Sequence, residues 1–144
     1  MGGQVELVRG LYDSFAQRDV AGMLGMLDPQ VEWNQAEHVT LWPGGPVVGP
    51  DAVAGQVLAR FPELFGDTFR IEVGRLHECG DVVIMEGRYR ATVRPTGKDL
   101  DVQVVHVWDI ADGKVVRWQQ YTDTWEFAEA TGIRPLDTST AGAG

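Results

Sequence analysis

The chain has 144 residues, of which 44% are hydrophobic and 23% are charged, and its formal net charge is -9. This length is typical of one globular domain, and the single cysteine excludes a disulfide scaffold. Because 21 acidic residues outnumber 12 basic ones, the composition argues against a nucleic acid or an anionic membrane as partner. No apolar run approaches the roughly 20 residues of a membrane span. We therefore predict a soluble cytoplasmic protein.

The N-terminal half has the apolar spacing of helices. Helices are expected at residues 4–17, 20–27 and 51–65. Asp19 is suited to cap the second helix, and Asp28-Pro29 is suited to end it. A short strand, residues 31–34, and a loop or lid, residues 35–50, complete this half.

The C-terminal half alternates apolar and polar residues, as strands do. Four strands are expected at residues 68–78, 82–94, 99–110 and 114–122, followed by a short helix at 124–130. Turn residues separate the strands, so we predict an antiparallel meander. Helices followed by such a sheet predict an α+β fold with the helices packed on one face. We expect one domain, residues 1–133, and a disordered tail, residues 134–144.

The turns also predict which residues face one another. If Asp112-Gly113 is a two-residue turn, Ala111 pairs with Lys114, and counting outward places His106 opposite Gln119. One face of the last two strands would then carry Val102, Val104, His106, Trp108, Gln119, Tyr121 and Asp123. The same count across Thr96-Gly97 adds Met85, Gly87, Tyr89 and Ala91 to that face.

This face is mostly apolar, holds a few polar groups and should be covered by helices, as is typical of a small-molecule cavity. A carboxylate removed from water, such as Asp123, could take a proton from carbon or from water near neutral pH. His106 could act as the complementary acid or as a hydrogen-bond donor. By strand rise the two groups lie roughly 13 Å apart, so they could flank a ligand.

Structural explanations exist for the same residues. Asp123 precedes a helix and could be only its N-cap. His106 could be a buried neutral imidazole bonded to a neighbour, and Tyr89 and Tyr121 could be core aromatics. No pair of His, Cys, Asp or Glu on one element has ligand spacing, so we predict neither a metal nor a cofactor.

Several short segments occur in the order found in a known superfamily. They are Asp19, residues 31–34, residues 49–53, residues 95–98 and residues 113–123. From Val5 to Gly132 the chain resembles the nuclear transport factor 2-like superfamily, and within it SnoaL-like polyketide cyclases, limonene epoxide hydrolase and ketosteroid isomerase. The resemblance implies a cone-shaped, curved antiparallel sheet packed with three N-terminal helices, a cystatin-like α+β barrel.

The resemblance also suggests site residues. Asp123 matches the carboxylate that activates water in the epoxide hydrolase and Asn34 matches its amide, whereas Gly87 and Tyr89 replace the rest of that relay. The cyclases' pocket histidine matches His106, and their catalytic aspartate falls on Gln120; the isomerase's general base aligns with Asn34. The catalytic candidates are therefore Asp123, His106, Tyr89 and Asn34. The candidates for substrate binding are Trp33, Tyr12, Met85, Val104, Trp108, Gln119 and Tyr121.

Two functions follow from this set. The first is a cofactor-independent acid-base enzyme, a cyclase, isomerase or hydrolase, acting on an apolar molecule that bears a ring or a carbonyl group. The second is a non-catalytic ligand-binding or dimeric pocket protein of the same fold. The resemblance further implies a homodimer through the outer face of the sheet, with Val105, Val107 and Trp118 in the interface.

Overall fold

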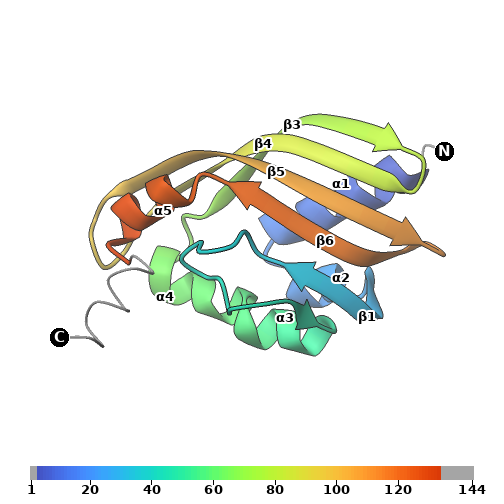
Figure 1. Ribbon diagram of the computed structural model, residues 1–144, viewed down its shortest axis with the longest axis horizontal. Helices are drawn as coiled ribbons and strands as arrows, with labels where there is room; N and C mark the ends of the chain where they lie inside the picture. The colour runs from blue at the N-terminus through green and yellow to red at the C-terminus, as the bar shows by residue number, and fades with distance from the viewer. Residues whose placement is uncertain (1–2, 134–144) are drawn as a thin grey trace.

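A curved sheet and the helices beside it form the molecule in the computed structural model, which describes residues 3–133 (Figure 1). The sheet has six strands in the order β2-β1-β6-β5-β4-β3. They are β1 Leu27–Asn34, β2 Val47–Val48, β3 Arg70–Cys79, β4 Val82–Thr92, β5 Asp99–Ala111 and β6 Lys114–Thr122. The predicted α+β fold with a curved sheet is confirmed, although β2 and β3 remain edges and do not close a barrel. The predicted tail, residues 134–144, lies outside the described residues.

The helices before β3 lie on one side of the sheet, and α5 lies near the end of β6 (Figure 1). They are α1 Gly3–Ala16, α2 Val20–Leu24, α3 Pro50–Gln56, the 3-10 helix η1 Leu58–Arg60, α4 Phe61–Phe65 and α5 Thr124–Thr131. The predicted cap is confirmed, since the Asp19 carboxylate accepts a hydrogen bond from the Gly22 amide at 2.9 Å. Within residues 3–133, no helix has the length and apolar character that crossing a membrane requires.

Several predicted boundaries are wrong. The helix expected at 20–27 ends at Leu24, and Asp28-Pro29, predicted to end it, lies within β1. The helix expected at 51–65 is interrupted by η1, and Pro62, which lacks an amide hydrogen, lies in the first turn of α4, where none is needed. The strand expected at 31–34 begins at Leu27, because β1 lies parallel to β6 and Leu27 pairs with Val115. This pairing joins segments far apart in sequence, so local periodicity does not reveal it.

The faces predicted for the side chains of β4 and β5 are confirmed, but the pairing is shifted by two residues from the one that a two-residue turn at Thr96-Gly97 would give. Met85 pairs with His106, Gly87 with Val104, Tyr89 with Val102 and Ala91 with Leu100. The side chains of Glu86, Arg88 and Arg90 are exposed on the opposite face. The connection is longer than predicted, since the Val93 amide donates to the Lys98 carbonyl oxygen at 2.8 Å; a shift by two residues leaves every side chain on its predicted face.

The predicted register between β5 and β6 is wrong beyond Val115. Ala111 pairs with Lys114 and Ile110 with Val115, but Asp109 pairs with Arg117, so Val116 is the extra residue of a β-bulge. Beyond a bulge every side chain changes face. His106 consequently faces Gln120, and Trp108 faces Trp118.

The bulge determines which side chains of β6 point toward the helices and which lie on the outer face. Trp118 and Gln120 point inward and are only 3% and 4% exposed, whereas Tyr121 lies on the outer face and is 58% exposed. Gln119 and Asp123 share the outer parity with Tyr121. The inner face of β6 therefore contributes an indole and an amide to the core.

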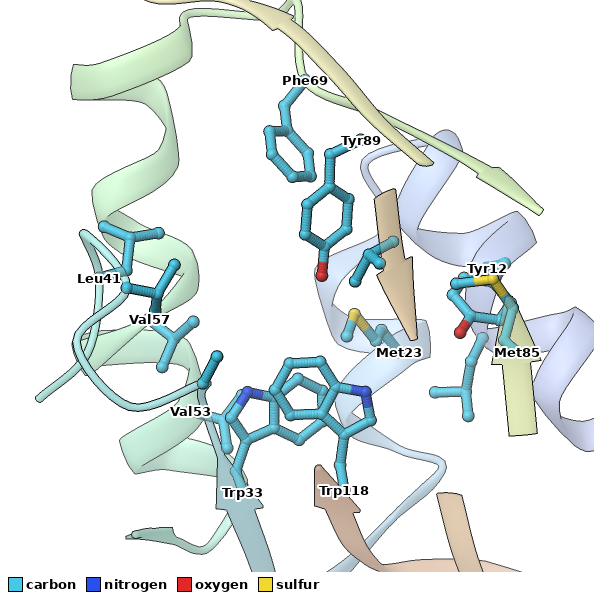
Figure 2. Packing of buried hydrophobic residues seen from close by; sticks show 14 of the residues in the cluster. Tyr12, Met23, Trp33, Leu41, Val53, Val57, Phe69, Met85, Tyr89 and Trp118 are labelled. Atoms are coloured by element: carbon cyan, nitrogen blue, oxygen red, sulfur yellow. The ribbon is translucent and has the colours of Figure 1, made fainter. Parts of the chain in front are cut away.

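The core between the sheet and the helices is rich in aromatic rings (Figure 2). Trp33 of β1 stacks on Trp118 of β6, with ring centroids 4.0 Å apart and planes at 21°. Figure 2 shows the hydroxyl of Tyr89 pointing toward this indole pair, with Val53 and Val57 of the helical side next to it. Aromatic contacts thus join strands that are neighbours only in three dimensions.

Replacing Gly87 tests how closely β3 and β4 approach at the bend of the sheet. A Cβ atom at Gly87 would collide with the backbone oxygen of Glu72 and lie 2.7 Å from the Met85 sulfur. We expect Gly87→Ala to lower the free energy of unfolding by about 1–3 kcal/mol in denaturant titrations, because backbone must move. Gly55→Ala is the control: a Cβ atom there meets nothing within 4 Å, and the helix should gain up to about 1 kcal/mol. An equal effect of the two substitutions would contradict the close approach.

Candidate functional site

An apolar cavity lies between the inner face of the sheet and the helices. Its volume is about 50 Å³, and its walls include the rings of Phe15, Phe61, Phe69 and Phe127. None of its lining residues, all within the described part of the chain, is Asp, Glu, Lys or Arg. Its polar groups are those of Tyr12, Trp33, Gln35, Tyr89, His106, Trp108, Trp118 and Gln120.

A chain of buried hydrogen bonds runs along one wall of this cavity. The hydroxyl of Tyr12, from α1, contacts Nδ1 of His106 at 2.7 Å, and the hydroxyl of Tyr89, from β4, contacts Nε2 at 2.5 Å. His106 lies on β5 between the two phenols and is 2% exposed. Both ring nitrogens of the imidazole are therefore held by hydroxyl groups.

Each phenol also accepts a hydrogen bond from a second side chain. The indole of Trp108 donates to Tyr12 Oη at 2.9 Å, and Nε2 of Gln120 donates to Tyr89 Oη at 2.8 Å. The amide of Gln120 is oriented by its own oxygen, which accepts from the Ala36 backbone amide at 3.0 Å. Gln120 was not among the predicted site residues, although the resemblance places it at the cyclases' catalytic aspartate.

Burial keeps Tyr12, His106 and Tyr89, the three titratable groups of this hydrogen-bonded series, neutral. Desolvation lowers the pKa of His106 to about 3, because the charged imidazolium is disfavoured away from water. Desolvation also raises the pKa of Tyr12 and that of Tyr89 well above the usual value for a phenol. At neutral pH the wall of the cavity thus offers hydrogen-bond donors and a neutral imidazole, with no ionised group.

The indole of Trp118 differs from the other two indoles of the site. Trp108 donates to Tyr12, and Trp33 donates to Gln35 Oε1 at 3.1 Å. The nitrogen of Trp118 is buried and has no hydrogen-bond partner. It is the one such side-chain atom among residues 3–133.

Asp123 and Asn34 lie away from the cavity. The Asp123 carboxylate accepts from the backbone amides of Trp125 and Glu126 at 3.1 and 3.3 Å, and so caps α5. Asn34 donates to Glu32 Oε2 at 2.8 Å on the outer face. The prediction that Asp123 and His106 share one hollow is wrong, because the bulge at Val116 turns the end of β6 over.

The predicted binding residues divide into three groups. Tyr12, Trp33 and Trp108 line the cavity. Met85 and Val104 are buried in the core without lining it. Gln119 and Tyr121 lie on the outer face, contrary to the predicted register.

The outer face also differs from the predicted dimer surface. Val105 and Val107 are half-buried there, but Trp118 faces the cavity. A dimer through this face would therefore use Val105 and Val107 without the indole.

A second hollow of about 350 Å³ adjoins the cavity between α1, α2, η1 and α4. The two spaces share a wall formed by Phe15, Met23, Leu58, Phe61 and Phe69. Within residues 3–133, no group of three or more His, Cys, Asp or Glu side chains could hold a metal ion.

The buried imidazole gives the stability of the fold a defined pH dependence. The unfolded chain gains a proton at His106 below about pH 6.5, whereas the folded chain does so only near pH 3, so acid favours unfolding throughout that interval. We expect the free energy of unfolding to fall by about 1.4 kcal/mol per pH unit from this group between about pH 6 and pH 5. Denaturant titrations should show that this contribution is lost in His106→Gln. His38→Asn, on an exposed loop, should retain it; equal slopes for the two variants would contradict a buried neutral His106.

Comparison with known proteins agrees with the fold. The family model for the SnoaL-like domain matches residues 8–118. An NTF2-like protein from Burkholderia thailandensis E264 is 32% identical, with a TM-score of 0.82 over 88% of this chain and 95% of that one. The structure of TerC co-crystallized with polyporic acid is similar at 29% identity and a TM-score of 0.79, over 91% of this chain and 99% of that one.

A more distant structure supports the fold alone. A protein with a cystatin-like fold from Xanthomonas campestris has 22% identity and a TM-score of 0.74, over 85% of this chain and 93% of that one. The predicted superfamily is thus confirmed by a sequence-family match and by structures that cover most of both chains. The chain belongs to the SnoaL-like domain family of the NTF2-like superfamily.

Proposed function

We propose that this protein binds a small apolar molecule bearing a ring and a carbonyl oxygen, and acts on it by cofactor-independent general acid-base chemistry as a cyclase, isomerase or hydrolase. The observation that carries the proposal is the buried chain Tyr12-His106-Tyr89 at the wall of an otherwise apolar cavity. Apolar walls with a few convergent polar groups are typical of small-molecule sites. TerC, a family relative, was co-crystallized with polyporic acid, which supports a ring-bearing ligand.

Space for such a ligand comes from two adjoining hollows. The cavity of about 50 Å³ is smaller than the roughly 300 Å³ at which small-molecule pockets begin. The neighbouring hollow adds about 350 Å³ if the shared wall moves. Phe61 lies at the start of α4, next to η1, and is partly buried, so its ring is suited to act as the movable part of this wall.

The chemistry rests on neutral hydrogen-bond donors. A phenol that donates to a carbonyl oxygen stabilises the negative charge that develops there when a neighbouring carbon gives its proton to a hydroxide ion from the solvent, and the enolate then takes a proton back from water. His106 in turn contacts the phenol oxygen and holds its orientation. Because the site is desolvated, such a hydrogen bond is stronger than it would be in water.

A second candidate function is ligand binding without catalysis. It is favoured by one observation: no carboxylate lines the cavity, since Asp123 caps α5 on the outside. His106 is then the single side chain of the lining with a basic nitrogen, and both its nitrogens are engaged. Measuring proton exchange on a bound ketone separates the two functions.

Deuterium exchange at the methyl group of acetophenone in heavy water tests acid-base catalysis directly. We expect the protein to accelerate this exchange, measured by proton NMR, and Tyr89→Phe to reduce the acceleration about 100-fold, because the donor to the carbonyl oxygen is lost. Asp123→Asn should leave the rate unchanged, since asparagine caps a helix as well as aspartate does. Binding of acetophenone without exchange above buffer would favour the non-catalytic function. A loss of exchange in Asp123→Asn alone would restore Asp123 as the base.

Opening the shared wall tests the access route. We expect Phe61→Ala to raise the association rate constant of acetophenone, measured by stopped-flow quenching of tryptophan fluorescence, because a ring that blocks the passage is removed. Phe127→Leu is the matched control, since Phe127 lines the cavity but not the second hollow. Equal rates in the wild type and in Phe61→Ala would place the access route elsewhere.

A further inference from the structure

We propose that the cavity contains a carbonyl-binding subsite formed by the indole N-H of Trp118 and one surplus hydroxyl proton of the Tyr12-His106-Tyr89 chain. The ligand class that follows is a neutral ketone or quinone. This inference rests on the proposed function of the cavity and narrows it to one functional group. It comes from counting the protons and acceptors of the buried network.

The count leaves one proton over. A neutral imidazole has one N-H group and each phenol has one O-H group, so the chain holds three protons. Its two contacts, Tyr12 with His106 and His106 with Tyr89, use two of them. Whichever tautomer His106 adopts, one phenol donates to the ring, the other accepts from it, and the accepting phenol keeps a proton that the chain does not use.

No other member of the network can accept that proton. The indole nitrogen of Trp108 is a donor only, and it already points at Tyr12 Oη. Gln120 presents its NH₂ group to Tyr89, because its oxygen is taken by the Ala36 amide. The surplus proton therefore needs an acceptor from outside this hydrogen-bonded network. Because both phenols line the cavity, a ligand in the cavity can supply that acceptor.

Trp118 supplies an independent observation of the same kind. Its side chain lines the same cavity, its residue is 3% exposed and its N-H group has no partner. A buried donor without an acceptor is costly, so native structures rarely retain one without a role. The cavity thus contains two hydrogen-bond donors without an acceptor, the Trp118 N-H group and one phenol O-H group, and an oxygen atom of a ligand would satisfy both.

The charge of the walls narrows the ligand further. A carboxylate would need a cation or several strong donors to offset its desolvation, and no Lys or Arg lines the cavity. A neutral carbonyl oxygen has two lone pairs, which match two donors. The apolar rings around it match the remainder of an aromatic ketone or quinone.

A pair of probes of equal shape tests the subsite. Acetophenone has a C=O group where α-methylstyrene has C=CH₂, and benzoate has the same ring with a charged group. We expect the infrared C=O stretch of acetophenone bound to the wild-type protein to lie below its value in hexane, since hydrogen bonds weaken the C=O bond. Benzoate should not compete for the site.

Two variants of the stacked indole pair provide the comparison. In Trp118→Phe the preference for acetophenone over α-methylstyrene, expressed as the ratio of their Kd values, should fall about three- to tenfold, which corresponds to one hydrogen bond. The C=O stretch should rise at the same time. Trp33→Phe is the control for packing: it removes the other indole of the stack, whose N-H already serves Gln35, so it should change the Kd values of both probes by the same factor and shift neither their ratio nor the C=O stretch.

The outcomes separate the subsite from the cavity itself. If both probes bind but the C=O stretch of bound acetophenone equals that in hexane, the subsite is overturned and the apolar pocket stands. An equal change of ratio in Trp118→Phe and Trp33→Phe also overturns it, because packing then explains the effect. If neither probe binds, the proposed function falls and the subsite falls with it. Should Trp118→Phe fail to fold, the stretch in the wild-type protein alone decides.

Discussion

The burial of a neutral imidazole between two phenols is the interaction on which the interior of this protein depends. Away from water, His106 must have both ring nitrogens satisfied without becoming charged, and Tyr12 and Tyr89 satisfy them from opposite sides. These hydroxyls are in turn held by Trp108 and Gln120. The polar groups of the core thus form one connected set, and the position of each is determined by its neighbours.

Aromatic packing surrounds this set and fixes its geometry. The Tyr12 ring meets the Trp108 indole edge to face, with centroids 5.6 Å apart at 89°, and the His106 ring lies 4.9 Å from that of Trp118. Large rings with few rotamers hold polar atoms in place at low entropic cost. A site built in this way on strands β1, β4, β5 and β6 and on α1 is rigid on the sheet side. The movable wall, with Leu58 and Phe61, belongs to the short helices η1 and α4.

The sequence predicts the sheet where turn chemistry and alternation agree. Between β4 and β5 both signals are present, and the face on which Tyr89 and His106 lie follows from them, although the pairing is shifted by two residues. In β6 the count fails at Val116, because a hairpin turn determines register only up to the first bulge. One signal was available: because side chains alternate along a strand, the predicted inward position of Gln119 also turns the charged Arg117 inward and the apolar Trp118 outward, which conflicts with burial.

The remaining errors have a different physical origin. Resemblance alone assigned Asn34 to the site, and the turn count and resemblance together assigned Asp123, but a side chain's face depends on local bulges and not on sequence order alone. The role of Gln120 depends on the Ala36 amide, which lies 84 residues away in sequence. Contacts of this range are invisible to periodicity. The superfamily was nevertheless predictable, because it depends on the order of many elements.

The origin of Tyr12 has a consequence for motion in this protein. It is the one member of the hydrogen-bonded set that comes from α1, while its partners His106 and Trp108 come from the sheet. Any excursion that lifts the N-terminal helix off the sheet therefore breaks the polar set, and a molecule that binds against that set opposes the excursion. Ligand binding in the cavity and packing of α1 on the sheet are therefore thermodynamically coupled. Amide protons of α1 would exchange with solvent more slowly when a ligand fills the cavity.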